Sequence, residues 1–204
     1  MSARPPARAA ERGACVQRFR ILLDLDGTIL QNAGRELFAK QFGLVLAENE
    51  SALDATVARL GLDPRQFWDW WSANQTEIYS RAVPIEGAIE VIRSLRAAGA
   101  FVAVVTARRT EAESVTRQWI AQAGLEVDEM VFGADDKVSV ALQLDLNLAF
   151  EDNLQNAEGL SAHMPVLLID ARSNGGVDLS PGIIRVEDWS QVPAILDDLG
   201  RRTA

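Results

Sequence analysis

The sequence predicts an α/β fold, a doubly wound and mainly parallel β-sheet with a small helical insert after its first strand. Three observations support this prediction. Apolar strand-like runs alternate with amphipathic helical runs along most of the chain, which favours a parallel sheet covered by helices on both faces. Residues 31–83 interrupt the alternation and contain only helical patterns. Finally, acidic residues follow the first apolar run directly, at Asp24 and Asp26.

The expected elements follow one another in order along the chain. Strands are predicted at residues 20–24, 101–106, 129–132, 147–151, 165–169 and 183–185. Helical patterns lie near residues 87–98, 111–123, 136–144, 153–162 and 189–199. Thr110 and Glu113 have the spacing of a capping box at the start of the second helix. Gly99 and Gly124 are placed to end the first and second helices.

The insert carries three helical patterns. The first includes Leu37 and Phe42, the second runs near residues 51–60 and stops at Gly61, and the third begins with Asp63 as N-cap and Pro64 in its first turn. These patterns predict a helical cap domain at 31–83, an α/β core at 19–30 and 84–204, and a flexible tail at 1–18.

The third pattern is rich in aromatic residues. A small helical bundle needs most of these large side chains for its own core. One tryptophan is nevertheless expected to face the cleft and stack on a substrate ring, with Trp71 as the candidate. The four aromatic residues in question are Phe67, Trp68, Trp70 and Trp71.

The composition, 48% apolar and 24% charged residues, is typical of a soluble globular protein. The net charge of −9 argues against a nucleic-acid polymer or an anionic membrane as partner. One cysteine excludes an intramolecular disulfide, and one histidine disfavours Ser-His-Asp hydrolysis. No apolar run reaches the roughly 18 to 20 residues of a membrane span. Because the first 18 residues lack a secretory apolar segment, we expect a cytoplasmic protein. Its expected oligomeric state is a monomer or a homodimer.

The most informative motif is the run from Asp24 to Thr28. Its two carboxylates lie two residues apart at the end of an apolar strand and therefore point the same way. Gly27 allows the sharp turn that follows. A cation, a phosphoryl group or a shared proton would relieve the repulsion between the carboxylates. An ordinary capped turn uses the same residue types, so the motif alone leaves both interpretations open.

Two further strand ends carry polar residues, and open α/β sheets bind ligands beyond the carboxyl ends of their strands. Thr106, followed by Ala107 and Arg108, offers a hydroxyl and backbone N–H groups to an anion, or is simply a β-branched strand residue. Lys137 lies in the first turn of a predicted helix, where its charge opposes the helix dipole. It either holds a phosphate oxygen or is compensated by the two acidic residues before it.

The strand at 147–151 ends in Glu151 and Asp152. Adjacent carboxylates at the tip of a buried strand suit a hard cation such as Mg²⁺, although Asp152 could instead cap the next helix. A carboxylate pair, an oxygen donor, a lysine and a second acid pair at four strand ends together indicate one coherent catalytic site more strongly than any one motif does.

Over residues 20–184 the chain resembles the haloacid dehalogenase (HAD) superfamily of phosphotransferases. The four motifs appear in the right order at residues 24–28, Thr106, Lys137 and residues 151–152. The resemblance implies a Rossmann-like core with a cap inserted between the first two motifs. It also implies that Asp24 attacks phosphorus, and that Asp26 protonates the leaving oxygen and then activates water. Thr106 and Lys137 would hold the phosphoryl oxygens.

The resemblance further implies Mg²⁺ as cofactor, bound by the Asp24 carboxylate, the Asp26 carbonyl and Asp152, with Glu151 assisting through water. An aspartate at position 26 is typical of the family's phosphatases and phosphomutases. Residues 104–108 and 150–153 are most similar to the cytosolic-type deoxyribonucleotidase branch. We therefore expect a Mg²⁺-dependent phosphatase acting on a small phosphorylated metabolite, with a (deoxy)nucleoside monophosphate as candidate substrate. Ala107 and Arg108 are further candidates for substrate binding.

Other functions are compatible with the same motifs. A sugar-phosphate phosphatase or a phosphomutase would use the same residues, and a non-catalytic HAD-like binding protein is a further alternative. A response-regulator receiver is excluded because its phosphorylated aspartate follows the third strand. In this chain the third predicted strand ends in Val131, Phe132 and Gly133.

Overall fold

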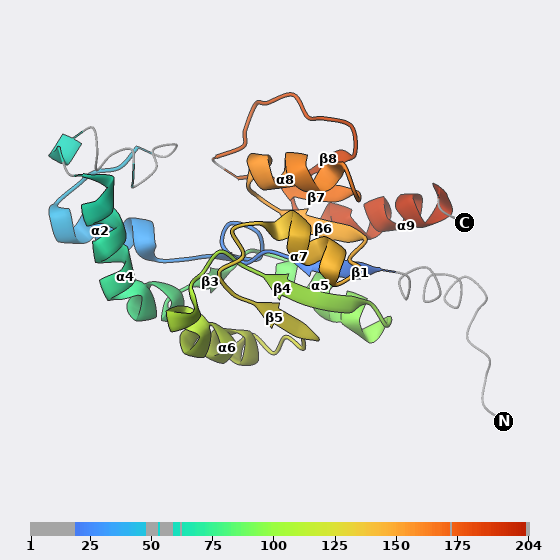
Figure 1. The fold of residues 1–204 in the computed structure, drawn as a ribbon, viewed down its shortest axis with the longest axis horizontal. Helices are drawn as coiled ribbons and strands as arrows, with labels where there is room; N and C mark the ends of the chain where they lie inside the picture. The colour runs from blue at the N-terminus through green and yellow to red at the C-terminus, as the bar shows by residue number, and fades with distance from the viewer. Residues whose placement is uncertain (1–18, 48–52, 54–58, 62, 172, 203–204) are drawn as a thin grey trace.

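The computed structural model describes residues 19–47, 53, 59–61, 63–171 and 173–202. Within these residues lies a six-stranded sheet in the order β5-β4-β1-β6-β7-β8, with every neighbouring pair parallel. The chain begins at the central strand, winds outward to one edge and then returns to build the other half (Figure 1). The strands are β1 (Arg20–Leu23), β4 (Phe101–Val105), β5 (Glu129–Val131), β6 (Leu148–Glu151), β7 (Val166–Ile169) and β8 (Ile183–Val186).

This arrangement is the predicted doubly wound sheet, and each of the six predicted strands is confirmed to within one residue at either end. The side chains of β1 alternate between two core layers, because Ile21 and Leu23 enter one layer and Leu22 enters the other. The first layer is covered by α5 (Ala88–Ala97), α6 (Glu113–Gln122) and α9 (Val192–Arg202). The second is covered by α7 (Lys137–Gln143) and α8 (Leu154–Ser161).

The helix ends agree with the sequence at most positions. Gly99 and Gly124 follow the ends of α5 and α6 with φ of 97° and 64°, the left-handed backbone that favours glycine. The capping box expected at Thr110 and Glu113 is wrong. A tight 3₁₀ turn, Thr110–Ala112, precedes α6, so Thr110 is already inside a turn and α6 starts without a side-chain cap.

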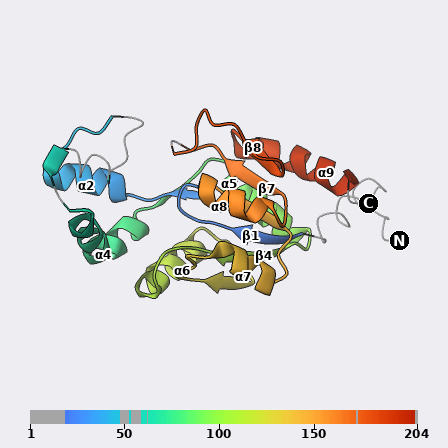
Figure 2. The same cartoon turned by 45° about the horizontal axis from the view of Figure 1, so that its top comes forward.

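Two helices of the insert, α2 (Gly34–Phe42) and α4 (Pro64–Ser80), stand apart from the sheet in both views (Figures 1 and 2). The chain leaves and re-enters the core through an antiparallel pair, β2 (Leu30–Gln31) and β3 (Val83–Pro84). The sequence indicated no strand here, because two residues are too few to show a period of two. Most of the pattern predicted near residues 51–60 lies outside the described residues, and the domain boundaries stay a prediction.

Helix α4 begins as predicted. The Asp63 carboxylate accepts a hydrogen bond from the Arg65 N–H (2.8 Å), and the Asp63 N–H donates to the Gln66 side chain (3.0 Å). Pro64 occupies the first turn, where its missing N–H is not needed. Phe67 and Phe38 then pack in the core between α4 and α2.

Among the described residues, none of the helices combines the length and the apolar character that crossing a membrane would require.

Candidate active site

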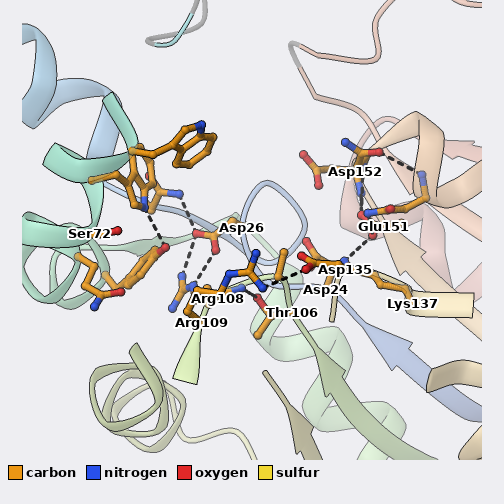
Figure 3. A pocket seen from close by; sticks show the side chains of 18 residues that line it. Asp24, Asp26, Ser72, Thr106, Arg108, Arg109, Asp135, Lys137, Glu151 and Asp152 are labelled. Carbon is orange, nitrogen blue, oxygen red and sulfur yellow. Dashed lines mark hydrogen bonds and ion pairs between the residues drawn. The ribbon is translucent and has the colours of Figure 1, made fainter. Parts of the chain in front are cut away.

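A cavity of about 640 Å³ lies beyond the carboxyl ends of the central strands. Because β4, β1 and β6 are parallel neighbours, the residues that follow them meet at one edge of the sheet. Asp24 follows β1, Thr106 follows β4, and Glu151 ends β6. These residues line the cavity together with Asp26, Ala107, Arg108, Lys137, Asp152 and Trp71, so the structure brings all the predicted site residues together (Figure 3).

Lys137, the first residue of α7, is buried between two carboxylates. Its ammonium donates to Asp24 Oδ1 (2.6 Å) and to Glu151 Oε1 (2.5 Å). The alternative in which the two preceding acids compensate this charge is therefore wrong. Asp136 instead caps α7 by accepting from the Ser139 N–H, and Asp135 pairs with Arg109 at the surface.

Glu151 is fully buried and all of its acceptor capacity is used. Oε1 accepts from Lys137 and from the Asn156 amide (2.8 Å), and Oε2 accepts from the N–H groups of Asp152 and Asn153 (2.9 and 3.1 Å). A carboxylate offers about four lone-pair sites. Glu151 therefore holds Lys137 and the turn after β6 in place and has no lone pair left for a direct ligand.

Asp152 directs its carboxylate toward Asp24 and Gly27. Asn153, and not Asp152, caps α8 by accepting from the Asn156 N–H, so the capping alternative for Asp152 is wrong. Within the described residues the Asp152 carboxylate accepts no hydrogen bond. A Cβ added to Gly27 would lie only 2.1 Å from Asp152 Oδ2, and Gly27 has a φ of 85°. Glycine is thus needed both for the turn and for the close approach of the acid.

Asp26 is held by partners from two other segments (Figure 3). The Arg108 guanidinium donates to both carboxylate oxygens, Nε to Oδ2 (2.6 Å) and Nη2 to Oδ1 (2.8 Å). The Asn32 amide donates to Oδ1 as well (2.7 Å). Arg108 was a candidate for substrate binding from its sequence position. The structure places its guanidinium, buried, against Asp26.

Thr106 is buried, and its hydroxyl oxygen accepts a hydrogen bond from the Arg108 backbone N–H (3.2 Å). The carbonyl of Thr106 accepts from Ala134, and its N–H donates to Val131, so the loop after β4 is tied to the loop after β5. Ala107 is exposed at the cavity. Thr106 and Ala107 of this loop line the same cavity as Lys137.

The wall opposite the sheet edge comes from α4. Trp68 and Trp71 line the cavity with Ser72, Gln75 and Tyr79, and the Trp68 side chain is 52% exposed. Trp71 Nε1 donates to the Tyr79 hydroxyl (3.0 Å). The other two aromatic residues lie away from the cavity: Phe67 is buried, and Trp70 donates to Gln41 on α2.

Burial dominates the electrostatics of the acidic cluster. It raises the pKa of Asp24 to about 7, and repulsion from Glu151 adds to this shift while Lys137 opposes it. Burial is also the largest cause that raises the pKa of Asp152 to about 8, and repulsion from Asp24 and Glu151 raises it further. For Lys137, burial alone would lower the pKa, but attraction to Asp24 and Glu151 outweighs it and leaves the pKa above its usual value.

These residues fit a hard divalent cation. Carboxylate oxygens of Asp24, Glu151 and Asp152 lie within 4.8 Å of one another, and of these three residues Asp24 and Asp152 retain acceptor capacity for a direct ligand. Two buried carboxylates and the half-buried carboxylate of Asp152 lie around one ammonium, so the cluster carries excess negative charge when ionised. Oxygen ligands of this kind are the ones that Mg²⁺ prefers.

Sequence reasoning missed several residues that support the site. Asn32 holds Asp26, Asn156 holds Glu151, and the buried Asn174 donates to the carbonyls of Asp152 (2.7 Å) and Ile169 (2.9 Å). No local pattern marks them, because each acts across a turn or between distant segments. Trp68 was within the aromatic set but was not singled out.

Several solved structures have a similar fold. A phosphonoacetaldehyde hydrolase-like protein from Oleispira antarctica aligns over 90% of this chain and 93% of its own, with a TM-score of 0.64 and 18% identity. A HAD-family hydrolase from Deinococcus radiodurans, with bound phosphate and sodium, aligns over 90% and 97%, with a TM-score of 0.64 and 21% identity. The chain has the haloacid dehalogenase fold. The HAD fold was the fold expected from the four motifs.

Two curated sequence relatives have higher identity than these solved structures and also cover most of the chain. The candidate nucleotidase YqfW of Bacillus subtilis is 28% identical over 174 residues, 83% of this chain and 89% of the relative. The nucleotidase CA_C3379 of Clostridium acetobutylicum is 27% identical over 187 residues, 90% and 96% of the two chains. No protein-family model matches the chain.

Proposed function

We propose that this protein is a Mg²⁺-dependent phosphatase that hydrolyses a (deoxy)nucleoside monophosphate through an aspartyl-phosphate intermediate. One observation carries the proposal. The buried Asp24 carboxylate, paired with Lys137, opens onto a cavity that is also lined by Asp26 and by two indole rings. A nucleophile, an acid–base group and an aromatic wall are the parts that such a reaction requires.

Asp24 is suited to act as the nucleophile because its position is defined from several sides. Its N–H donates to the Phe150 carbonyl (3.1 Å), and its carboxylate is held by Lys137 (2.6 Å) and more loosely by the Thr28 hydroxyl (3.3 Å). The Lys137 ammonium favours the ionised carboxylate against the effect of burial. The same ammonium, with Thr106 and the Ala107 N–H, is positioned to hold phosphoryl oxygens as negative charge spreads over them.

The reaction has two steps with balanced proton transfers. In the first, an Asp24 oxygen forms a bond to phosphorus as the bond to the ester oxygen breaks, and the Asp26 carboxyl proton passes to the leaving alkoxide. In the second, Asp26 takes a proton from water as the water oxygen attacks phosphorus. Asp24 then leaves as a carboxylate, and inorganic phosphate is released.

Asp24 and Asp152 are the carboxylates that would hold Mg²⁺, joined by the backbone carbonyl of Asp26. Glu151 supports them from behind, because its oxygens already accept four hydrogen bonds. When bound, the ion supplies positive charge that offsets the negative charge of the phosphoryl group.

The nucleotide assignment is supported by the α4 wall and by the two nucleotidase relatives. A cavity of about 640 Å³ is within the range that accommodates a ligand of nucleotide size. Trp68 and Trp71 offer aromatic surface, and stacking of a base on such a ring is worth about 1–3 kcal/mol. Ser72 and Gln75 add a hydroxyl and an amide that can hydrogen-bond to base edges.

The test is phosphate release from a panel of nucleoside and deoxynucleoside monophosphates, sugar phosphates and 4-nitrophenyl phosphate, with Mg²⁺ or with chelator. We expect Mg²⁺-dependent turnover with preference for the nucleotides, and no turnover by Asp24→Asn. Asp178→Asn, an exposed aspartate outside the cavity, is the matched control. Activity retained by Asp24→Asn would refute the assignment of Asp24 as the nucleophile. A preference for sugar phosphates would refute the assignment of a nucleotide as the substrate.

Replacement of Trp68 by alanine tests the base-stacking wall separately. Loss of one stacking contact should lower kcat/KM for nucleotides by roughly 10-fold while leaving 4-nitrophenyl phosphate much less affected. Equal losses on both substrates would argue against a base at this wall.

A further inference from the structure

Arg108 is the most unusual charged residue of the site. It follows β4 by three positions and lines the cavity, yet only 4% of it is exposed. Buried arginines persist only where their charge is paired and their donors are used. Among the described residues the acid that pairs with Arg108 is Asp26, the residue proposed above to move the protons.

The Arg108 guanidinium has three partners. Nε and Nη2 form a two-pronged contact with the Asp26 carboxylate, and Nη1 donates to the Thr116 hydroxyl of α6 (3.0 Å). Its flat face lies 3.7 Å from the centre of the Tyr79 ring of α4. A planar guanidinium whose nitrogens donate to two partners and whose face packs on an aromatic ring can adopt only one orientation.

That single orientation fixes Asp26 in turn. The carboxylate accepts two hydrogen bonds from Arg108 and one from Asn32, so three of its roughly four lone-pair sites are used. One lone pair, on Oδ2, is left to carry a proton. Proton transfer depends on placing the acid within hydrogen-bond reach of the leaving oxygen.

From these contacts we infer that Arg108 is a positioning residue, which aims the free lone pair of Asp26 at the leaving oxygen of the substrate. The inference rests on the proposed function, because it assigns Arg108 a role in that same reaction. The contact with Tyr79, whose hydroxyl accepts from Trp71, joins this alignment to the α4 wall. Arg108 thus links the group that moves protons to the helix that faces the substrate.

The same geometry separates this role from direct phosphate binding. The Nε–Nη2 edge of Arg108 is already filled by Asp26, and Nη1 donates to Thr116, so a phosphate would have to compete with these partners for the guanidinium. Arg108 therefore acts through Asp26, and its loss should matter most when the leaving group needs a proton.

The experiment compares two esters with wild type and Arg108→Met. The alkoxide leaving group of a deoxynucleoside 5′-monophosphate is a strong base and must be protonated as it departs. The leaving group of 4-nitrophenyl phosphate is a weak base and departs without a proton. We expect Arg108→Met to lower kcat/KM by about 100-fold for the nucleotide, the typical minimum contribution of a general acid, and to change kcat/KM for the aryl ester little.

Two further variants keep the inference falsifiable. Arg108→Lys retains the charge but lacks the fork, so it should show the same substrate-selective loss even if Arg108→Met folds poorly. Asp26→Asn combined with Arg108→Met should have the same nucleotide kcat/KM as Asp26→Asn alone. Arg117→Met, an exposed arginine paired with Glu113 outside the cavity, is the matched control and should match wild type.

The possible outcomes are distinct. Equal losses on the two esters, as expected for a phosphate ligand or for a purely structural role, would overturn the inference and leave the proposed function standing. A double variant clearly worse than Asp26→Asn would overturn it as well. Wild-type protein that turns over neither ester in Mg²⁺ would instead refute the proposed function itself.

Discussion

Replacement of Gly27 by alanine should separate the cost of backbone strain from the loss of a metal ligand. Gly27 has a φ of 85°, where an alanine costs about 1–2 kcal/mol. The new Cβ would lie 2.1 Å from Asp152 Oδ2, whereas ordinary contact begins at 3.4 Å. The carboxylate must therefore move by 3.4 − 2.1 = 1.3 Å. Since metal–ligand distances hold to about 0.2 Å, Mg²⁺ affinity should fall at least about 10-fold.

The assay is titration calorimetry with Mg²⁺ in the absence of substrate, together with thermal melting. Gly43→Ala is the matched control, because Gly43 has a φ of 63° but no atom within 4 Å of the added Cβ. Both variants should melt about 2–8 °C below wild type, and only Gly27→Ala should lose Mg²⁺ affinity. Wild-type affinity in Gly27→Ala would refute the assignment of Asp152 as a ligand.

Three further predictions concern stability. Burial raises the pKa of Asp24 to about 7 and of Asp152 to about 8, so the folded protein retains protons that the unfolded chain loses above its pKa of 3.8. The free energy of unfolding, measured in chelator, should thus fall from pH 4 to pH 8. A melting temperature that does not change over this range would contradict the raised pKa values of Asp24 and Asp152. Trp189→Phe removes the buried hydrogen bond to the Thr28 carbonyl (3.1 Å) and should cost about 1–3 kcal/mol in urea unfolding. Asp63→Ala removes the N-cap of α4 and should cost about 0.5–2 kcal/mol, measured in the same way.

The strands and most helix ends could be predicted because they depend on local properties. A strand buried on both faces is a short apolar run, and a helix end needs a residue such as Gly99 or Gly124 that adopts a positive φ. The predicted capping box at Thr110 failed because the tight turn before α6 satisfies the backbone in another way. The β2–β3 pair was missed because its two short segments are joined only by the return of the chain from the insert.

The site, too, could be predicted only in part from the sequence. The positions of Asp24, Asp26, Thr106 and Lys137 follow from the parallel sheet, since parallel strands bring their carboxyl ends to one edge. The partners of these residues do not follow. Asp26 and Arg108 are 82 residues apart, and nothing near either residue in the sequence indicates their contact.

The sequence by itself therefore determined the architecture, the order of the motifs and the chemical types at the sheet edge, because each of these depends on hydrophobic periodicity or on residue identity. Only the tertiary structure decided how the charges are distributed. It showed that Lys137 is shared between Asp24 and Glu151, and that the Asp152 carboxylate accepts no hydrogen bond among the described residues. It also showed that two of the four aromatic residues at positions 67–71, Trp68 and Trp71, line the cavity. Pairing and burial arise from segments distant in sequence, and these determine which groups remain free to react.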